Sequence, residues 1–131
     1  MGGSLIITTP NIWYPQSRLQ FFIRGFFPSF PSLVDKQIHF GRHMHITPWS
    51  FPQLYLYLKL AGFGMPDLIN EPLSKPKHSF ERLVGLPAMI YCNGKLKKSK
   101  TKEEREFWQI AGTSGSRLGR HLIVHAEKRK I

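Results

Sequence analysis

The feature that most constrains the fold is an apolar stretch near the amino end, residues 2–11, with the sequence GGSLIITTPN. The glycine pair favours a tight turn, because glycine adopts backbone conformations that other residues avoid. The apolar and β-branched residues after it are typical of a strand buried on both faces, and Pro10 ends the run. Such a strand belongs in the middle of a sheet, so the rest of the chain must supply its neighbours.

Length and composition favour a small folded protein. The chain has 131 residues, which suffices for at most one domain with a modest core. Hydrophobic residues make up 41% of it and aromatic residues 13%, which argues against a disordered chain. Cys92 is the single cysteine, so no internal disulfide can form and a reducing compartment is favoured. We find no secretory signal pattern and no apolar run of membrane-spanning length, and therefore expect a cytoplasmic protein.

Sequence patterns predict several helices and two further strands after the first stretch. The best specified helix starts at Ser50, where Ser50-Phe51-Pro52-Gln53 forms a capping box, and stops at Gly62. Its leucines form a broad apolar stripe, so we expect it to pack on the sheet with little solvent-facing surface. The other predicted elements are a helix at 17–24 that ends at Gly25, a strand at 65–70, a broken helix from 80 to about Asn93-Gly94, a helix at 103–110, a glycine and serine loop at 112–119, and a last strand at 122–126.

Three segments together resemble a known family. They are GGSLIITTPN at 2–11, then HITPWS at 45–50 followed by a helix and Ala61-Gly62-Phe63, and finally GRHLIVHAEK at 119–128. In this order they are similar to the fifth strand, the following helix and the final strand of the small-molecule branch of class I S-adenosylmethionine-dependent methyltransferases. The resemblance implies an α/β fold. In it, the fifth, seventh and sixth strands of a Rossmann-like mixed sheet are neighbours, with the seventh antiparallel and helices flanking them.

By this resemblance, residues 1–131 form a partial methyltransferase domain, namely the C-terminal half of the family's domain. The family binds its cofactor through a glycine-rich loop after the first strand and an acidic residue at the end of the second. No Gly-x-Gly-x-x-Gly motif occurs here, and every acidic residue lies at Asp35 or later. We therefore expect the complete protein to move a methyl group from S-adenosylmethionine to a small-molecule acceptor, and this chain alone neither to bind that cofactor nor to catalyse the transfer. The expected partner is a missing N-terminal half, or a second copy joined through the exposed edge of the first strand.

Three residues are candidates for the acceptor side of the site. His45 lies in the loop before the capped helix, where a neutral imidazole can act as a base toward the acceptor; alternatively it only hydrogen-bonds the loop backbone. Asn11 and Trp13 follow the first strand and are candidates for substrate binding. The alternatives are that Asn11 stabilises the turn and that Trp13 packs beneath a covering loop. Although His39 and His43 lie near His45, we expect no metal site, because no cysteine and only one carboxylate is close.

The charge pattern leaves two other functions open. The formal net charge is +11, and much of it lies in a predicted basic loop at 95–102 and a basic tail at 128–131. A solvated loop and tail are one interpretation, and contact with nucleic acid is another. A third hypothesis is a peripheral protein that places the basic, aromatic segment from Arg18 to Phe30 on an anionic membrane.

Overall fold

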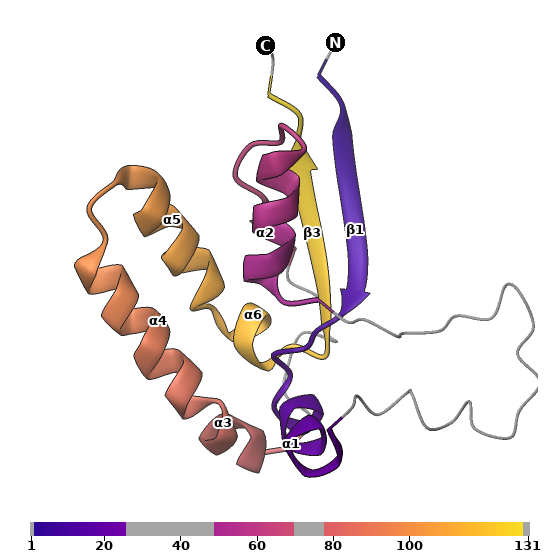
Figure 1. Ribbon diagram of the computed structural model, residues 1–131, viewed down its shortest axis with the longest axis vertical. Helices are drawn as coiled ribbons and strands as arrows, with labels where there is room; N and C mark the ends of the chain where they lie inside the picture. The colour runs from indigo at the N-terminus through magenta and orange to yellow at the C-terminus, as the bar shows by residue number, and fades with distance from the viewer. Residues whose placement is uncertain (1, 26–48, 70–77, 130–131) are drawn as a thin grey trace, which may run out of the picture.

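A computed structural model describes residues 2–25, 49–69 and 78–129 of the chain, which form a small mixed α/β unit (Figure 1). Its helices and strands follow one another in the order β1 (Ser4–Pro10), α1 (Pro15–Arg24), α2 (Phe51–Leu60), β2 (Asp67–Leu68), α3 (Phe80–Val84), α4 (Leu86–Lys98), α5 (Lys102–Ala111), α6 (Ser114–Leu118) and β3 (His121–Glu127). None of the helices within these ranges combines the length and the apolar character needed to cross a membrane.

The sheet has the order β1-β3-β2, so the last strand lies between the other two. β3 is antiparallel to β1, with Ser4 opposite Glu127 and Pro10 opposite His121, and it is also antiparallel to β2. The predicted α/β class is therefore confirmed. The Rossmann-like part of the prediction is not, because a Rossmann sheet is built from parallel neighbours joined by helices, whereas each neighbouring pair here is antiparallel.

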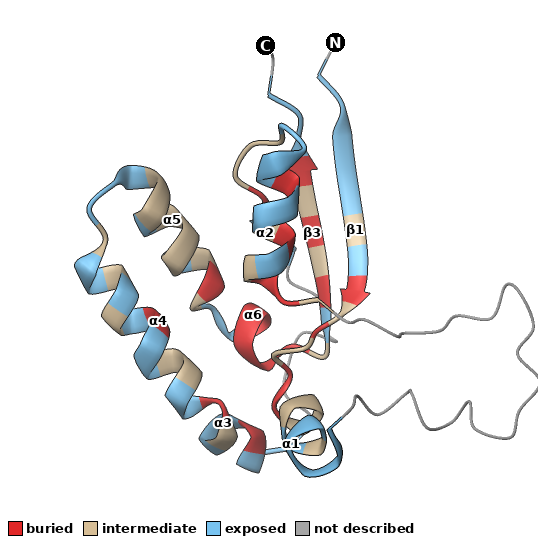
Figure 2. Ribbon diagram, viewed as in Figure 1, coloured by how far each residue is buried: buried red, intermediate tan, exposed pale blue. Residues whose placement is uncertain are grey.

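The core lies on one face of this sheet. Leu122, Val124 and Ala126 alternate along β3 with more exposed residues, as a strand with one covered face requires (Figure 2). Phe51, Leu54 and Leu58 of α2 and Ala111 of α5 pack against them in the same cluster. Two helices thus cover the face of the sheet that carries the apolar side chains of β3.

The prediction that the first strand is buried on both faces is wrong. Ile6 is 63% exposed and Leu5 37% exposed, and burial increases only toward Thr9. The physical reason is that β1 has a strand partner on one edge only, and that the helices of the described residues pack on the opposite face from Ile6. Apolar side chains of β1 are therefore exposed to solvent.

Helix ends follow the local chemistry of the sequence. The predicted capping box is confirmed, since the Ser50 side chain accepts from the Gln53 N–H while the Gln53 side chain accepts from the Ser50 N–H. Gly25 and Gly62 follow α1 and α2 with φ of 79° and 84°, conformations that favour glycine. The expectation that α2 has little solvent-facing surface is wrong, because Leu60 is 76% exposed while Leu54 and Leu58 are buried.

Two predicted loops are helical. The prediction of a basic loop at 95–102 holds only for residues 99–101, because Lys95, Lys97 and Lys98 form the last turn of α4 and Lys102 begins α5. Positive charge at the end of α4 is favoured by the helix dipole. The predicted loop at 112–119 contains α6, which Thr113 caps by accepting a hydrogen bond from the Ser116 N–H. Gly115, Ser116, Arg117 and Leu118 are all buried, so packing outweighs the poor helix propensity of the glycine and serine.

Candidate functional site

The carboxyl end of β1 is held by backbone hydrogen bonds to two distant parts of the chain. The Asn11 N–H donates to the Arg120 carbonyl at 3.0 Å, just before β3. The Ile12 N–H donates to the Trp49 carbonyl at 3.0 Å, and the Trp49 N–H donates to the Pro10 carbonyl at 3.3 Å. These bonds place the start of α2 beside the segment that leads from β1 into α1.

Asn11 holds this junction together. It is 2% exposed, and its Nδ2 donates to the Ser116 carbonyl at 2.7 Å and to the Gly119 carbonyl at 2.8 Å. Its Oδ1 accepts from the Trp13 N–H at 3.0 Å. Both amide hydrogens are thus used by the backbone. The structure favours the turn-stabilising role of Asn11 over the predicted contact with a substrate.

A hollow opens beyond this junction, between the Ile12-Trp13 segment, α1 and the start of α2. Its volume is about 860 Å³, within the range of small-molecule sites. The residues that line it are mostly apolar: Ile12, Trp13, Arg18, Phe21, Phe22, Gly25, Ser50, Pro52 and Gln53. We call this space the β1-end hollow. It lies past the carboxyl end of β1, where open α/β sheets place their ligands.

Most of the polar groups in the β1-end hollow already have partners within the protein. Ser50 and Gln53 bond to each other in the capping box, with the Ser50 N–H 2.8 Å from Gln53 Oε1. Arg18 is different. Its Nη2 reaches the Val84 carbonyl only at 3.5 Å, and its Nε is buried without a hydrogen-bond partner among the described residues. Burial, and then the neighbouring Arg117 guanidinium, lower the pKa of Arg18.

A buried hydrogen bond fixes α1 beneath the hollow. Tyr14 Oη donates to Oε1 of the fully buried Glu81 at 2.5 Å, which links the start of α1 to α3. Burial of the ring, followed by the hydrogen bond to Glu81, raises the pKa of Tyr14 to about 12. Both effects favour the protonated phenol, so the bond is intact at neutral pH.

The three predicted site residues have different outcomes. Trp13 lines the β1-end hollow, Asn11 lies buried beside it, and His45 falls outside the described residues. Sequence reasoning missed Arg18 as a residue of the site. A basic residue in the first turns of a helix that otherwise presents Leu19, Phe21 and Phe22 was the available signal.

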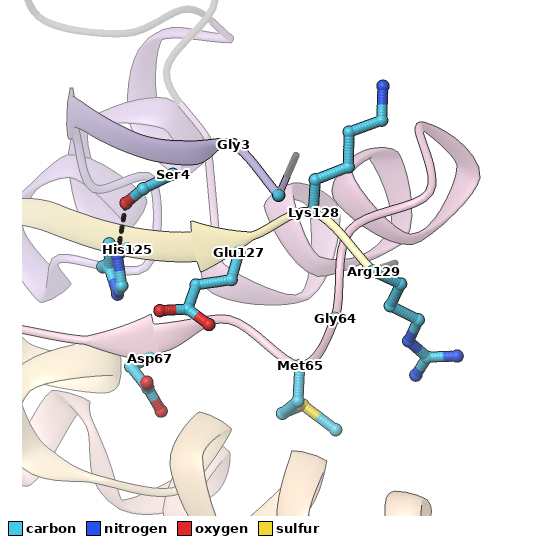
Figure 3. A pocket seen from close by; sticks show the side chains of 10 residues that line it. Gly3, Ser4, Gly64, Met65, Asp67, His125, Glu127, Lys128 and Arg129 are labelled. Carbon is cyan, nitrogen blue, oxygen red and sulfur yellow. Dashed lines mark hydrogen bonds between the residues drawn. The ribbon is translucent and has the colours of Figure 1, made fainter. Parts of the chain in front are cut away.

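A second hollow lies at the amino ends of β1 and β2, with a volume of about 710 Å³ (Figure 3). Ser4 Oγ and His125 Nε2 lie 2.7 Å apart on its wall, and Asp67, Glu127 and Arg129 line it as well. Gly2 and Gly3 also line it, but they precede a strand rather than open a helix, unlike a glycine-rich loop that binds phosphates. Gly2 and Gly3 therefore do not have the arrangement of a phosphate-binding loop.

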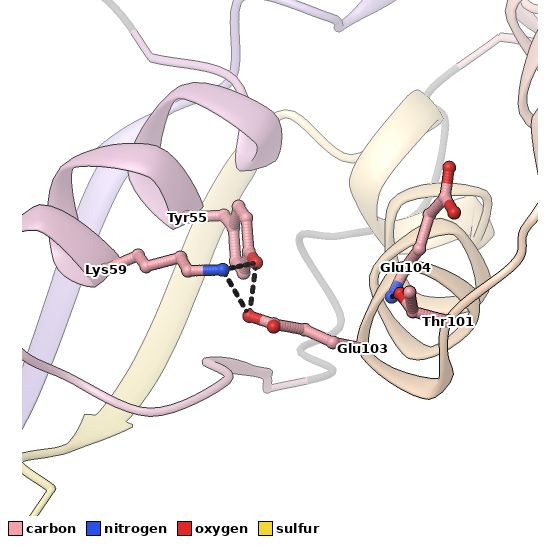
Figure 4. Close-up of polar contacts among 5 residues, drawn as sticks. All are labelled: Tyr55, Lys59, Thr101, Glu103 and Glu104. Atoms are coloured by element: carbon pink, nitrogen blue, oxygen red, sulfur yellow. Dashed lines mark hydrogen bonds and ion pairs between the residues drawn. The ribbon is translucent and has the colours of Figure 1, made fainter.

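A surface cluster joins α2 to α5 (Figure 4). Lys59 Nζ lies 2.6 Å from Glu103 Oε1, and Tyr55 Oη donates to the same oxygen at 2.7 Å. The hydrogen bonds from Lys59 and then Tyr55 lower the pKa of Glu103, while hydrogen bonds to Glu103 and then to Tyr55 raise the pKa of Lys59. All three groups satisfy one another, so this cluster is structural rather than a site for a ligand.

Comparison with known proteins assigns no function. No family model matches the chain, and no curated protein and no solved structure is significantly similar to it. The β1-end hollow is therefore interpreted from its own chemistry: an apolar space with aromatic walls and a cation whose hydrogen-bonding capacity is not fully used. Such a space suits a small molecule with an apolar body.

Proposed function

We propose that the chain is the acceptor-binding half of a class I S-adenosylmethionine-dependent methyltransferase, which in complete form methylates a small molecule. The observation that carries this proposal is the order β1-β3-β2 with a reversed last strand in the middle. The resemblance implies this order, with a reversed middle strand, for the family's fifth, seventh and sixth strands. In this proposal the missing half supplies the parallel strands that define a Rossmann sheet. The β1-end hollow supports it, because it lies at the carboxyl end of the proposed fifth strand.

The outer edge of β1 is the proposed junction with the cofactor-binding half. Within the described residues β1 pairs only with β3, so one row of its backbone groups has no strand partner. A fourth strand from the missing half pairs there in this proposal. Without that half, the same edge makes the isolated chain self-associate, which sedimentation at increasing concentration tests. A stable monomer at all concentrations would count against an open edge.

The acceptor side supplies binding and orientation in this proposal. The apolar walls of the β1-end hollow contact the apolar part of the acceptor, and Trp13 sets one side of the space. S-adenosylmethionine supplies the methyl group when the complete protein binds it. His45 remains the predicted base that takes the acceptor's proton, and it lies outside the described residues.

The first test is calorimetric titration of S-adenosylmethionine into the purified chain. The proposal expects no binding, and tight saturable binding would contradict a missing cofactor half. The positive test fuses the chain, from Gly2, behind the first four strands of a complete methyltransferase of this class. We expect the fusion to bind the cofactor and to be cooperatively folded, while the same four-strand half alone does not fold. A fusion no better folded than that half alone would refute the proposed strand pairing.

A peripheral membrane protein is a second candidate, favoured by one observation. α1 exposes Phe22 at 86% and Ile23 at 71%, and Arg24 follows them on the same helix. Exposed aromatic side chains beside cations are typical of helices that lie in an anionic lipid surface. Co-sedimentation with anionic vesicles tests this function, and a chain that stays in the supernatant at low salt contradicts it.

A further inference from the structure

Arg18 has an unusual position in the β1-end hollow. Trp13, Phe21 and Phe22 give the hollow an apolar wall, and Arg18 is the cation that lines it. Neither of the ion pairs formed between described residues includes Arg18. The hollow therefore combines apolar surface with a positive charge that no such ion pair compensates.

The guanidinium also has hydrogen-bonding capacity to spare. Nε is buried and has no partner among the described residues, and the contact of Nη2 with the Val84 carbonyl, at 3.5 Å, is long. A buried donor left without a partner is destabilising, because the protein does not replace the hydrogen bond that water made to it. Arg117 lies close enough to act against the positive charge of Arg18. A negative charge beside the guanidinium offsets the repulsion from Arg117, while the buried Nε is not itself the point of contact.

We propose that the β1-end hollow binds a small apolar acid, with its hydrocarbon or aromatic body against Trp13, Phe21 and Phe22 and its anionic group on Arg18. A carboxylate or a phosphate monoester meets this requirement, because the planar guanidinium donates to two oxygens of either group. The inference deepens the proposed function by naming the class of the methyl acceptor. It rests on that proposal only for the methyl transfer, since binding of the acid needs no cofactor.

The experiment compares three probes of equal chain length: octanoate, octyl phosphate and the uncharged 1-octanol. The acids are titrated below their micellar concentrations and the alcohol below its solubility limit, into the full chain at neutral pH. Binding is followed by the indole N–H signal of Trp13 in a nitrogen-15 NMR spectrum. We expect the two acids to bind at least about 10-fold more tightly than the alcohol, the ratio that one charge-assisted hydrogen bond supplies. The tighter of the two acids identifies the anion. Equal binding of all three would overturn the inference.

Matched variants assign the effect to Arg18. Arg18→Met is expected to weaken octanoate binding at least about 10-fold and to leave octanol binding unchanged. Arg24→Met removes a cation that belongs to the same helix but does not line the hollow. This variant should change neither octanoate binding nor octanol binding. Equal losses in both variants would refute a specific contact. If Arg18→Met does not fold by circular dichroism, Arg18→Lys replaces it, with an expected smaller loss because the charge remains but the planar fork does not.

Two further outcomes separate this inference from the other proposals. Binding to anionic phosphatidylserine vesicles without binding to monomeric octanoate would overturn it in favour of a membrane surface. If the fusion to the cofactor-binding half neither folds nor binds the cofactor, but the chain binds octanoate, the methyltransferase proposal is refuted and the acid site stands. Conversely, if the fusion folds and binds the cofactor but the chain does not bind octanoate, only the proposed acid site is refuted.

Discussion

The hydrogen bond between Tyr14 and Glu81 makes the protein sensitive to alkaline pH. Tyr14 is 8% exposed and its phenol donates to a carboxylate that is fully buried. Burial of the phenol, then its hydrogen bond to Glu81 and the negative charge of that carboxylate, raise the pKa of Tyr14 to about 12. We expect the protein to lose stability as the pH rises above 10, and Tyr14→Phe to remove that part of the loss.

The magnitude follows from the two pKa values of Tyr14. The unfolded chain loses the phenolic proton near pH 10, whereas the folded protein keeps it until about pH 12. Between these values the folded state binds more protons than the unfolded state, so the free energy of unfolding falls as the pH rises. A difference of about two pKa units corresponds to about 2.7 kcal/mol. The contribution is fully present below pH 10 and lost above pH 12.

Urea unfolding at several values from pH 9 to pH 12.5 measures this loss. At pH 9, Tyr14→Phe should be less stable than the wild type by about 1.5–3 kcal/mol, because it lacks a hydrogen bond to a charged group. The difference should shrink by about 2.7 kcal/mol by pH 12.5. Tyr91→Phe, a change at a ring that is 56% exposed, is the control and should keep the wild-type loss. A difference between wild type and Tyr14→Phe that stays constant over this range would refute the reasoning.

Three other predictions concern the core, a helix cap and the thiol. Leu122→Ala removes a fully buried side chain from the centre of the sheet. It should lower the free energy of unfolding, measured in urea, by about 2–5 kcal/mol, and a loss below about 1 kcal/mol would be inconsistent with the described core. Ser50→Ala should lower it by about 1 kcal/mol, with Ser50→Thr nearly neutral, because the hydroxyl caps α2. Burial raises the pKa of Cys92, so the folded protein should react with a thiol reagent far more slowly than the urea-unfolded chain, and equal rates would contradict its burial.

Local signals in the sequence predicted those parts of the fold that depend on a few adjacent residues. The capping box at Ser50 and Gln53 and the glycine after α1 are set by hydrogen bonds within one helical turn, so the pattern alone was sufficient. The apolar run at 122–126 likewise predicted a strand, and the structure shows that Leu122, Val124 and Ala126 form its buried face. No local signal specifies which strands pair with this one.

Other features depend on contacts between distant segments, which no local pattern contains. α6 has a glycine and serine composition that favours a loop, yet contacts around its buried residues keep it helical. β1 has the composition of a buried strand, but its burial depends on what covers it, and Ile6 is exposed. The presence of Arg18 among the residues that line the β1-end hollow depends on α1 lying beside the start of α2. The site was therefore predictable in its location after β1, and not in its chemistry.

The order of synthesis and the order of assembly differ in this molecule. Ser4 contacts His125, 121 positions later, so β1 leaves the ribosome long before its strand partner exists. At about 5–20 residues per second, that wait is roughly 6 to 24 s. For this time an apolar nascent strand has no partner of its own, and a chaperone or another unfinished chain on the same message can bind it. The yield of soluble protein should therefore respond more to translation speed and chaperone supply than its modest size suggests.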